Sequence, residues 1–529
     1  MKKKSLTGIS FGVPDRREFL KSSAALGLGA VAAASLPGAN ARAATPNMGG
    51  TLRYGIGHGS TTDSMDPGTY ENDFTIFTGY CFRGHLTEIA PDGSVKGDLA
   101  KSWEASPDAA TWTFKLRKGV EFHNGKTVDA NDVVASWNHH RGEDSKSAAK
   151  PLVDPIVDIK ADGNDTVIFT LNAGNADFPF IASDYHLAIM PAVDGKADWA
   201  SGVGTGAYTL ENWDPGIKAE FKRQPNFYKA NAAFFDGVQV FTIADANSRV
   251  NAIKSGEVDF IDRVDLKIAN LLGRDPGIDI FEVSGTAHYT IPMDTRVAPF
   301  DNNDVRLALK YALDREALVK TILLGHGVVG NDHPIGTANR YHADDLPQRT
   351  YDPDKAKFHL KKAGLTSLSV DLSAADAAFA GAVDSAVLYR EHAANAGIDI
   401  NVIREPSDGY WSSVWMQKAW CFSYWGGRPT EDWMFSTAYA EGASWNETHW
   451  SHDRFNKLLA EGRSELDDSK RRAIYYDMQQ ICSDEGGAVV PMFNNYVNAV
   501  TTKLHIPDQV ASNWNNDGHK MTERWWFNA

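Results

Sequence analysis

Histidine has the widest chemical range of the residue types in this chain, because imidazole binds metal ions and transfers protons near neutral pH. The chain has 16 histidines, and His449 and His452 are the only close pair with the spacing of a helix turn. Trp450 follows His449 where the H-E-x-x-H zinc motif has glutamate. His139 and His140 are adjacent, so their side chains would leave a helix in different directions. We therefore predict no metal site, and we interpret His449 and His452 as surface residues.

Sequence motifs that usually carry catalysis are missing from the chain. It contains no G-x-S-x-G nucleophile elbow and no G-x-x-x-x-G-K-[ST] phosphate loop. Residues 55–59 read G-I-G-H-G, but a dinucleotide site needs its third glycine later and a helix directly afterwards. A loop rich in Ser, Thr, Asp and Pro follows instead. The sequence thus predicts no catalytic residue, no cofactor and a protein that is not an enzyme.

Tryptophan is concentrated in one stretch of the chain. Seven of the 15 tryptophans fall between residues 405 and 450, at positions 411, 415, 420, 425, 433, 445 and 450. Irregularly spaced tryptophan usually packs a core. Indole also offers a flat apolar surface and an N–H donor, which suits a ligand cleft. Both interpretations stay open from the sequence alone.

Length and charge limit the classes of partner. The chain has 529 residues, enough for two or three domains, and its 53 basic and 68 acidic residues give a net charge of −15. Apolar residues make up 43% and aromatic residues 11%, as in ordinary globular proteins. The acidic balance argues against binding to nucleic acid or to an anionic membrane, since both need clustered Lys and Arg.

The first 43 residues have the pattern of an export signal. Lysines and arginines precede an uncharged run at 24–36, and Ala41-Arg42-Ala43 matches an A-x-A cleavage site. Residues 15–21 resemble the twin-arginine signal, although Asp15 stands where Ser or Thr is usual, so the ordinary secretory route remains an alternative. No later stretch has 18 uncharged apolar residues, and Cys81, the first cysteine, is far from the cleavage site. We expect a soluble periplasmic protein without a lipid anchor, and a net charge of −20 after cleavage.

The three cysteines do not indicate a redox or zinc site. Cys81, Cys421 and Cys482 are an odd number, so at least one thiol is free or paired between chains. A bridge between Cys421 and Cys482 is left open. The chain has no C-x-x-C, which argues against a redox site or a zinc ribbon.

Strand and helix patterns alternate along the chain. Polar and apolar residues alternate at 111–117 and a strand is expected at 166–171, while Asp129 or Asn131 can cap a helix between them. Apolar spacing predicts one long helix from Asn303 to Gly325. A second helix should begin at Asp352-Pro353 and end at Gly364. Two strands at 368–372 and 398–402 flank a further helix, which predicts a βαβ unit within a mixed α/β fold that has more than one sheet.

Several segments in order carry a resemblance to a known family. They are residues 50–55, 64–67, 99–104, 111–120, 122–126, 129–133, 204–210, 252–259 and 299–309. With these segments the chain resembles the substrate-binding proteins of ABC importers in the peptide, nickel and oligosaccharide family, solute-binding protein family 5. The spacing holds across the mature chain.

The resemblance implies an α/β fold of two lobes that close over a ligand. The first lobe would comprise residues 44–290, with an extra subdomain near 95–200, and residues 488–529 would return to it. The second lobe would comprise residues 291–487. The resemblance implies a monomer that carries out no covalent chemistry. It would bind a small solute and deliver it to ABC permease subunits in the membrane. Ligand binding would shift a hinge between the lobes towards the closed form.

The resemblance also indicates ligand contacts. Peptide-binding members place an aspartate for the peptide ammonium after a G-W-type pair, and the matching stretch here runs from Tyr424 to Trp433. Arg428 falls at that aspartate, and a guanidinium binds carboxylate or phosphate instead. Trp425 and Gly427 precede it, and Glu431 and Asp432 could restore an acidic partner or lie on a solvated loop.

Other candidate contacts follow from the same comparison. Where peptide binders have an E-W pair, this chain has residues 405–411, so Tyr410 or Trp411 would supply the aromatic contact. Tyr70 and Asp73 would face the cleft from the first lobe. Ser373 and Asp376 follow a strand where peptide binders often place contacts.

These departures predict a peptide or peptide-like solute with at least one acidic group, such as an opine or an amino-acid conjugate. An oligosaccharide or a metal chelate bound by the same fold is an alternative. A chemoreceptor or chaperone role, and a secreted hydrolase, are two others.

Overall fold

A nine-stranded mixed sheet runs through the computed structural model, which describes residues 46–528. Its strands are β10 (Tyr208–Asp214), β11 (Lys218–Arg223), β12 (Gly237–Thr242), β1 (Thr51–Ile56), β13 (Phe260–Ile261), β19 (Ala488–Thr501), β14 (Ile278–Pro292), β18 (Ser423–Trp425) and β15 (Gly327–Val329). β1 pairs in parallel with β12 and β13, and the other pairs are antiparallel. The predicted signal peptide at 1–43 lies outside the described residues.

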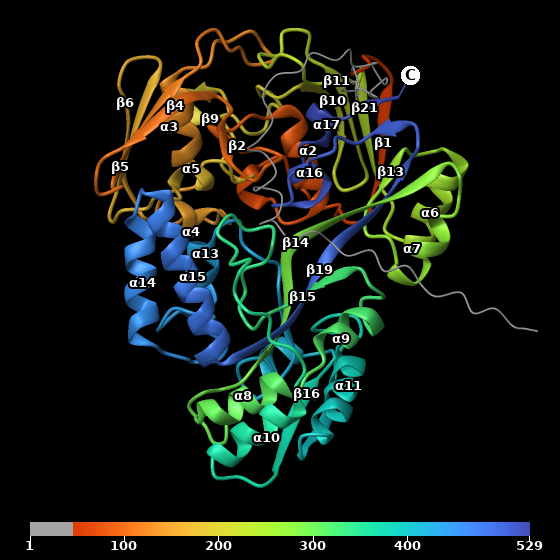
Figure 1. Ribbon diagram of the computed structural model, residues 1–529. Coiled ribbons are helices and arrows are strands. Elements are labelled where there is room, and N and C mark those ends of the chain that lie inside the picture. The colour runs from red at the N-terminus through yellow and green to blue at the C-terminus, as the bar shows by residue number, and fades with distance from the viewer. Residues whose placement is uncertain (1–45, 529) are drawn as a thin grey trace, which may run out of the picture. The chain divides into compact units, whose positions relative to one another are not determined.

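Two long strands link different parts of this sheet. β14 and β19 pair antiparallel from Ile278↔Thr501 to Pro292↔Ala488, and Figure 1 shows them side by side through the middle of the described chain. At one end β19 pairs with β13, and near the other end β14 pairs with β18. The predicted lobe boundaries near 290 and 487 fall in β14 and just before β19, and they remain predictions.

A separate four-stranded sheet forms between residues 100 and 171. Its order is β4 (Ala100–Ala105), β5 (Thr111–Leu116), β7 (Thr166–Leu171) and β6 (Ile156–Ala161). Helices α3 (Ala130–Asn138), α4 (Lys150–Val153) and α5 (Phe178–Ile181) accompany it. The predicted strands β5 and β7 are confirmed, and Asp129 caps α3 by accepting from the backbone N–H groups of Asn131 and Asp132. Trp137, Phe169 and Phe178 pack its core.

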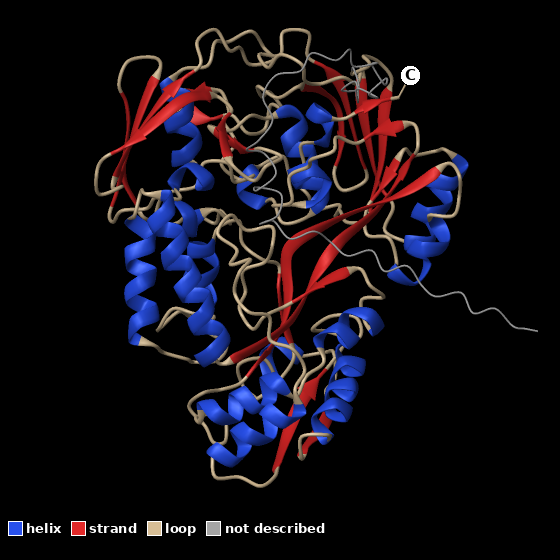
Figure 2. Cartoon of the chain, in the orientation of Figure 1, coloured by secondary structure: helices blue, strands red, loops and turns tan. Residues whose placement is uncertain are grey.

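The predicted βαβ unit is confirmed near the other end of the two long strands. β16 (Leu368–Ala374) and β17 (Ile398–Arg404) pair in parallel, and α11 (Ala382–Ala394) connects them. Helix α10 (Pro353–Lys362) begins after the capping Asp352, as predicted. Figure 2 shows these helices beside the strands of the pair.

The prediction of one helix from Asn303 to Gly325 is wrong. The segment forms α8 (Asn303–Tyr311) and α9 (Arg315–Thr321). The Asp314 carboxylate accepts from the Ala317 backbone N–H at 2.9 Å and caps a new helix, which breaks the first one while the apolar spacing continues.

Three helices follow β18: α13 (Glu431–Ala438), α14 (Asp453–Ser464) and α15 (Asp468–Glu485). Cys421 packs in the core around β16 and β17, whereas Cys482 packs in the core of these helices. The bridge between Cys421 and Cys482 therefore does not form, and all three cysteines are buried free thiols. The remaining elements are η1 (Pro67–Thr69), α2 (Asp73–Phe82), β2 (Thr87–Ile89), β3 (Val95–Gly97), β8 (Ala192–Val193), β9 (Lys196–Ala197), α6 (Ala246–Ser255), α7 (Leu266–Leu272), α12 (Tyr410–Ser413), β20 (Leu504–His505), α16 (Asn515–Gly518), α17 (Met521–Arg524) and β21 (Trp526–Phe527).

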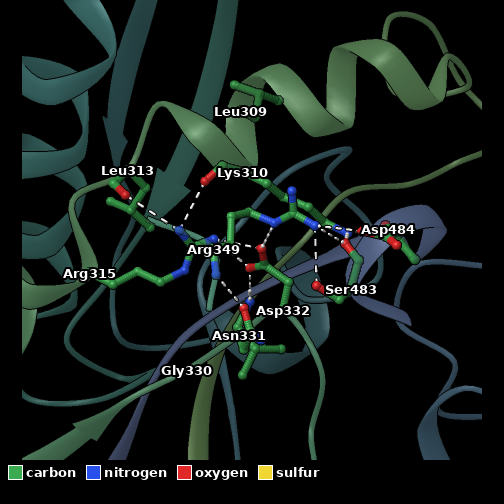
Figure 3. A network of polar contacts seen from close by, with 12 residues as sticks. Leu309, Lys310, Leu313, Arg315, Gly330, Asn331, Asp332, Arg349, Ser483 and Asp484 are labelled. Carbon is green, nitrogen blue, oxygen red and sulfur yellow. Dashed lines mark hydrogen bonds and ion pairs between the residues drawn. The ribbon is translucent and has the colours of Figure 1, made fainter. Parts of the chain in front are cut away.

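A buried ionic network joins α8, α9, α15 and β19. Asp332 is fully buried and accepts from Arg315 and from Arg349 (Figure 3). It also accepts from the backbone N–H of Val490 in β19. Lys310 Nζ donates to three carbonyl oxygens at the end of α15, those of Cys482, Ser483 and Gly486. Each buried charge therefore has partners, as burial requires.

Among residues 46–528, no helix is both long enough and apolar enough to cross a bilayer.

Candidate ligand-binding site

Three cavities meet at β18 and the loop after it. The Arg428 cavity has a volume of about 680 Å³, the asparagine cavity about 450 Å³ and the aromatic cavity about 410 Å³. Arg428 and Trp445 line both the first and the third, while Tyr424 and Gly426 line both the second and the third. The segment from Tyr424 to Arg428 is therefore the shared wall of one branched cleft.

Arg428 is a guanidinium without a carboxylate partner among the described residues. Its Nη1 donates to the carbonyl of Gly427 at 2.7 Å, and its Cζ lies 5.7 Å from the ring of Trp425 and 5.9 Å from the ring of Trp433. Burial lowers the pKa of Arg428, while the neighbouring Tyr185 opposes that shift. The two indoles hold the guanidinium in place and leave most of its N–H donors for a ligand.

The opposite wall of the Arg428 cavity includes Tyr70, Asp184, Tyr185 and His186. Asp184 Oδ1 lies 2.6 Å from His186 Nδ1, and His186 Nε2 lies 3.0 Å from the carbonyl oxygen of Tyr70. Burial favours a neutral Asp184, but the attraction of His186 holds the pKa of that carboxyl below its ordinary value. Both imidazole nitrogens thus lie within hydrogen-bond distance of an oxygen atom, so the ring of His186 is held from two sides.

This wall belongs to the segment predicted as the first lobe, and Arg428 belongs to the segment predicted as the second. Tyr70 Oη donates to the carbonyl of Met65 at 3.2 Å and accepts from Arg83 Nη1 at 3.2 Å. Tyr70 therefore contributes a fixed side chain to the wall of the cavity.

The aromatic cavity is lined by Trp411, Trp415, Tyr424, Trp425 and Trp445, together with Ser423, Gly426 and Arg428. A buried carboxylate, Glu447, lies behind two of the rings. Trp415 Nε1 donates to Glu447 Oε2 at 2.7 Å, and Trp425 Nε1 donates to Glu447 Oε1 at 3.0 Å. Glu447 thereby orients both indoles. The predicted contacts Trp411 and Trp425 lie in this cavity.

The asparagine cavity is polar on one side and aromatic on the other. Asn494, Asn495, Asn498 and Asn515 line it beside Asp73 and Arg263. Arg263 Nη2 donates to Asp73 at 2.7 Å, so the predicted contact Asp73 reaches the cleft as half of an ion pair. Tyr289 and Phe379 stack on the facing side, with ring centroids 3.7 Å apart.

Gly427 makes the turn that presents Arg428. Its φ is +76°, in the left-handed region, and a Cβ there would overlap the side chain of Thr286. Gly426 has no atom within 4 Å of an added Cβ.

Gly427→Ala is therefore expected to lower the unfolding temperature by several degrees and to weaken ligand binding, because the loop must shift away from Thr286. Gly426→Ala is the matched control and should leave the unfolding temperature unchanged. Differential scanning fluorimetry of both variants measures this, and equal unfolding temperatures would contradict the role of Gly427.

The two predicted acidic contacts do not face the Arg428 cavity. Glu431 is buried, and its carboxylate accepts from the Tyr341 backbone N–H at 2.7 Å. Asp432 pairs with Arg463 at 3.1 Å and lines a separate cavity of about 290 Å³. Burial raises the pKa of Glu431 to about 7 and that of Asp432 to about 6. Both are the first residues of α13, so neither lies on a solvated loop, and neither restores an acidic partner beside Arg428.

Three other predicted contacts also lie outside the described cavities. Tyr410 is buried in a core, and its hydroxyl donates to the Phe422 carbonyl at 2.8 Å. Ser373 is buried and donates to Glu405 at 2.8 Å. Asp376 is exposed and accepts from the backbone N–H groups of Gly381 and Val383.

Several residues of the cleft were not singled out in the sequence. Trp433 and Trp445 belong to the tryptophan-rich stretch, which was the available signal. The asparagines of strand β19 were a second signal, because a largely buried strand rarely carries several amide side chains. The pair Asp184 and His186 has no local signature.

The histidine pairs have structural partners. His452 Nδ1 accepts from the Phe455 backbone N–H at 3.1 Å and caps α14, and His139 Nε2 lies 2.7 Å from Asp66. His140 is buried, and its Nδ1 lies 2.7 Å from the hydroxyl oxygen of Ser147. Within residues 46–528 no three His, Cys, Asp or Glu side chains are placed to hold a metal ion.

Comparison with known proteins identifies the family. The family model described as bacterial extracellular solute-binding proteins, family 5 middle, matches residues 94–447. The chain belongs to this family. The dipeptide-binding protein of Escherichia coli, also a family 5 protein, is 26% identical over 451 residues, which are 77% of this chain and 82% of the relative.

Solved structures of family 5 proteins share the two-lobed fold. HbpA2 from Haemophilus parasuis has a TM-score of 0.80 at 20% identity and covers 91% of this chain and 100% of its own. AgaA from A. tumefaciens R10, solved with agropinic acid, has a TM-score of 0.68 at 24% identity and covers 91% and 99%. The mixed α/β, two-lobed fold predicted from the sequence is confirmed.

Proposed function

We propose that this family 5 protein is the periplasmic solute-binding component of an ABC importer, and that its solute is a small peptide-like molecule with an acidic group. The acidic preference rests on Arg428. Its guanidinium lines a cavity of about 680 Å³ and forms no ion pair with a described residue. A carboxylate or phosphate of the ligand would supply the missing partner through paired hydrogen bonds.

The relatives support the class of solute. One is a dipeptide-binding protein, and the structure of AgaA contains agropinic acid, an acidic small molecule. Arg428 in place of the aspartate of peptide binders favours an acidic conjugate over a plain dipeptide with a free ammonium at this position.

Transport would use closure of the predicted lobes. In this proposal residues 44–290 with 488–529 and residues 291–487 move as two bodies about β14 and β19. The solute contributes differential affinity for the closed form, and the closed monomer presents its surface to the permease.

Native mass spectrometry of the mature protein tests the proposal. We expect one small molecule per chain, and its release under denaturing conditions should yield a compound with a carboxylate or a phosphate. If the protein purifies empty, acidic conjugates should raise its unfolding temperature more than neutral sugars do. A bound compound without an acidic group, or sugars that stabilise more than acids, would contradict the proposal.

A further inference from the structure

The aromatic cavity has properties that an anion site does not explain. Among the described residues, four large aromatic side chains are exposed: Phe358, Trp411, Tyr424 and Trp445. Three of these four, with exposed fractions of 40%, 49% and 48%, line the aromatic cavity. Exposed aromatic surface gathered in one hollow indicates a binding site.

The rings meet at steep angles. Trp411 lies 5.9 Å from Trp415 at 76° and 5.5 Å from Tyr424 at 68°, measured between centroids and ring planes. Trp425 and Trp445 lie 6.0 Å apart at 53°. A compact group in such a corner can contact several rings at once, whereas a stacked pair offers it the face of only one ring at a time.

Glu447 places a buried carboxyl group behind this corner. Its side chain is buried, and it takes part in no ion pair within residues 46–528. Both indole N–H groups and the Thr290 hydroxyl, at 2.8 Å, donate to it. Burial raises the pKa of Glu447, and the hydrogen bonds from Trp415, Trp425 and Thr290 oppose that shift, because N–H and O–H donors favour the carboxylate over the neutral acid.

A buried carboxylate without a counter-ion is costly unless a cation comes near. Its charge also adds to the negative potential at the faces of the two rings that donate to it. Aromatic rings with such a potential attract ammonium groups, above all methylated ones, which lose little hydration on entering an apolar site.

We propose that the aromatic cavity binds a quaternary or methylated ammonium group of the solute. The inference rests on the proposed function, because Arg428 borders the same cavity and would hold the acidic group. The ligand class is then a zwitterion: its acid lies at Arg428, and its methylated ammonium lies among Trp411, Tyr424 and Trp445, in front of Glu447.

Calorimetric titration with matched probes tests the inference. The probes are carboxylates that carry a trimethylammonium group on chains of increasing length, γ-trimethylammoniobutyrate among them. Each is paired with the isostere in which a quaternary carbon replaces the nitrogen. We expect the best ammonium probe to bind at least about tenfold more tightly than its isostere.

Variants assign the effect to residues. Glu447→Gln should reduce the ratio of the ammonium probe's affinity to the isostere's affinity to near one, whatever it does to the two affinities themselves. Glu316→Gln, on an exposed site of α9, is the matched control and should keep the wild-type ratio. Trp445→Leu removes an exposed ring that makes no hydrogen bond to Glu447, and it should also reduce the preference for the ammonium probe. Equal affinity within every probe pair, or no binding of any pair at millimolar concentration, would overturn the inference.

The same experiment separates this inference from the proposed function. Arg428→Ala should weaken both members of a pair equally. If Arg428→Ala binds both probes as tightly as the wild type and still prefers the ammonium probe, the anion site is refuted and the aromatic site is supported. If Arg428→Ala binds both probes much more weakly and the wild type shows no preference for the ammonium probe, the anion site is supported and the aromatic site is refuted.

Discussion

Replacing Asp332 by asparagine is expected to lower the free energy of unfolding by about 3–5 kcal/mol. Arg315 Nη2 donates to both carboxylate oxygens, at 2.7 and 2.6 Å, and Arg349 Nε donates to one at 2.9 Å (Figure 3). Burial alone would raise the pKa of Asp332, but the neighbouring cations hold it below its ordinary value. Asparagine keeps the shape of the side chain and removes its charge, so two buried guanidinium groups lose their shared counter-ion.

Urea unfolding followed by tryptophan fluorescence measures this change. Asp354→Asn is the control, because that side chain is 94% exposed on α10 and its loss should change the free energy by less than about 0.5 kcal/mol. Asp332 also accepts from the Val490 backbone N–H of β19 at 3.1 Å, and the amide oxygen of asparagine can keep that bond, so the variant reports on the lost charge. Equal stability of the two variants would show that the network is not what stabilises this region.

Local sequence signals predicted the elements whose causes are local. The alternation of polar and apolar residues at 111–117 predicted β5, and the capping Asp352 predicted the start of α10. The apolar runs around residues 370 and 400 predicted the parallel strands β16 and β17. The break between α8 and α9 was missed because a capping carboxylate at Asp314 interrupts a helix without interrupting its apolar spacing.

One short segment carries several of the predicted residues. Trp425, Gly427 and Arg428 lie close together at the end of β18, whereas Tyr70, Asp73 and Trp411 line the cavities from other segments. Glu431 was misplaced because whether a carboxylate faces a cleft depends on its partner, and the Tyr341 N–H that binds it comes from 90 residues away.

The rest of the cleft depends on contacts between distant segments. Asp184 and His186 reach the Arg428 cavity from the other predicted lobe, and the carboxylate behind the aromatic cavity, Glu447, meets Trp415 from 32 residues away. No spacing in the sequence records such contacts. The same holds for Cys421 and Cys482, whose separate cores follow from the fold and not from their positions in the chain.

The second large effect is expected for binding. Arg428→Ala should weaken the complex with the acidic solute by about 2–5 kcal/mol, a loss in affinity of at least about 30-fold, because a buried anion would lose its charged partner. The affinity of Arg428→Lys should lie between those of Arg428→Ala and the wild type, since an ammonium keeps the charge but cannot form paired hydrogen bonds.

Isothermal titration calorimetry of wild type, Arg428→Ala and the control Arg390→Ala, an exposed arginine on α11, is the most direct test that the cleft recognises an acid. The titrant is the co-purified solute or, if none is present, the acidic conjugate that stabilises the protein most. We expect Arg390→Ala to match the wild type, and Arg428→Ala to bind at least about 30-fold more weakly while unfolding at a similar temperature. Equal affinity of Arg428→Ala and the wild type would contradict recognition of the solute through its acidic group.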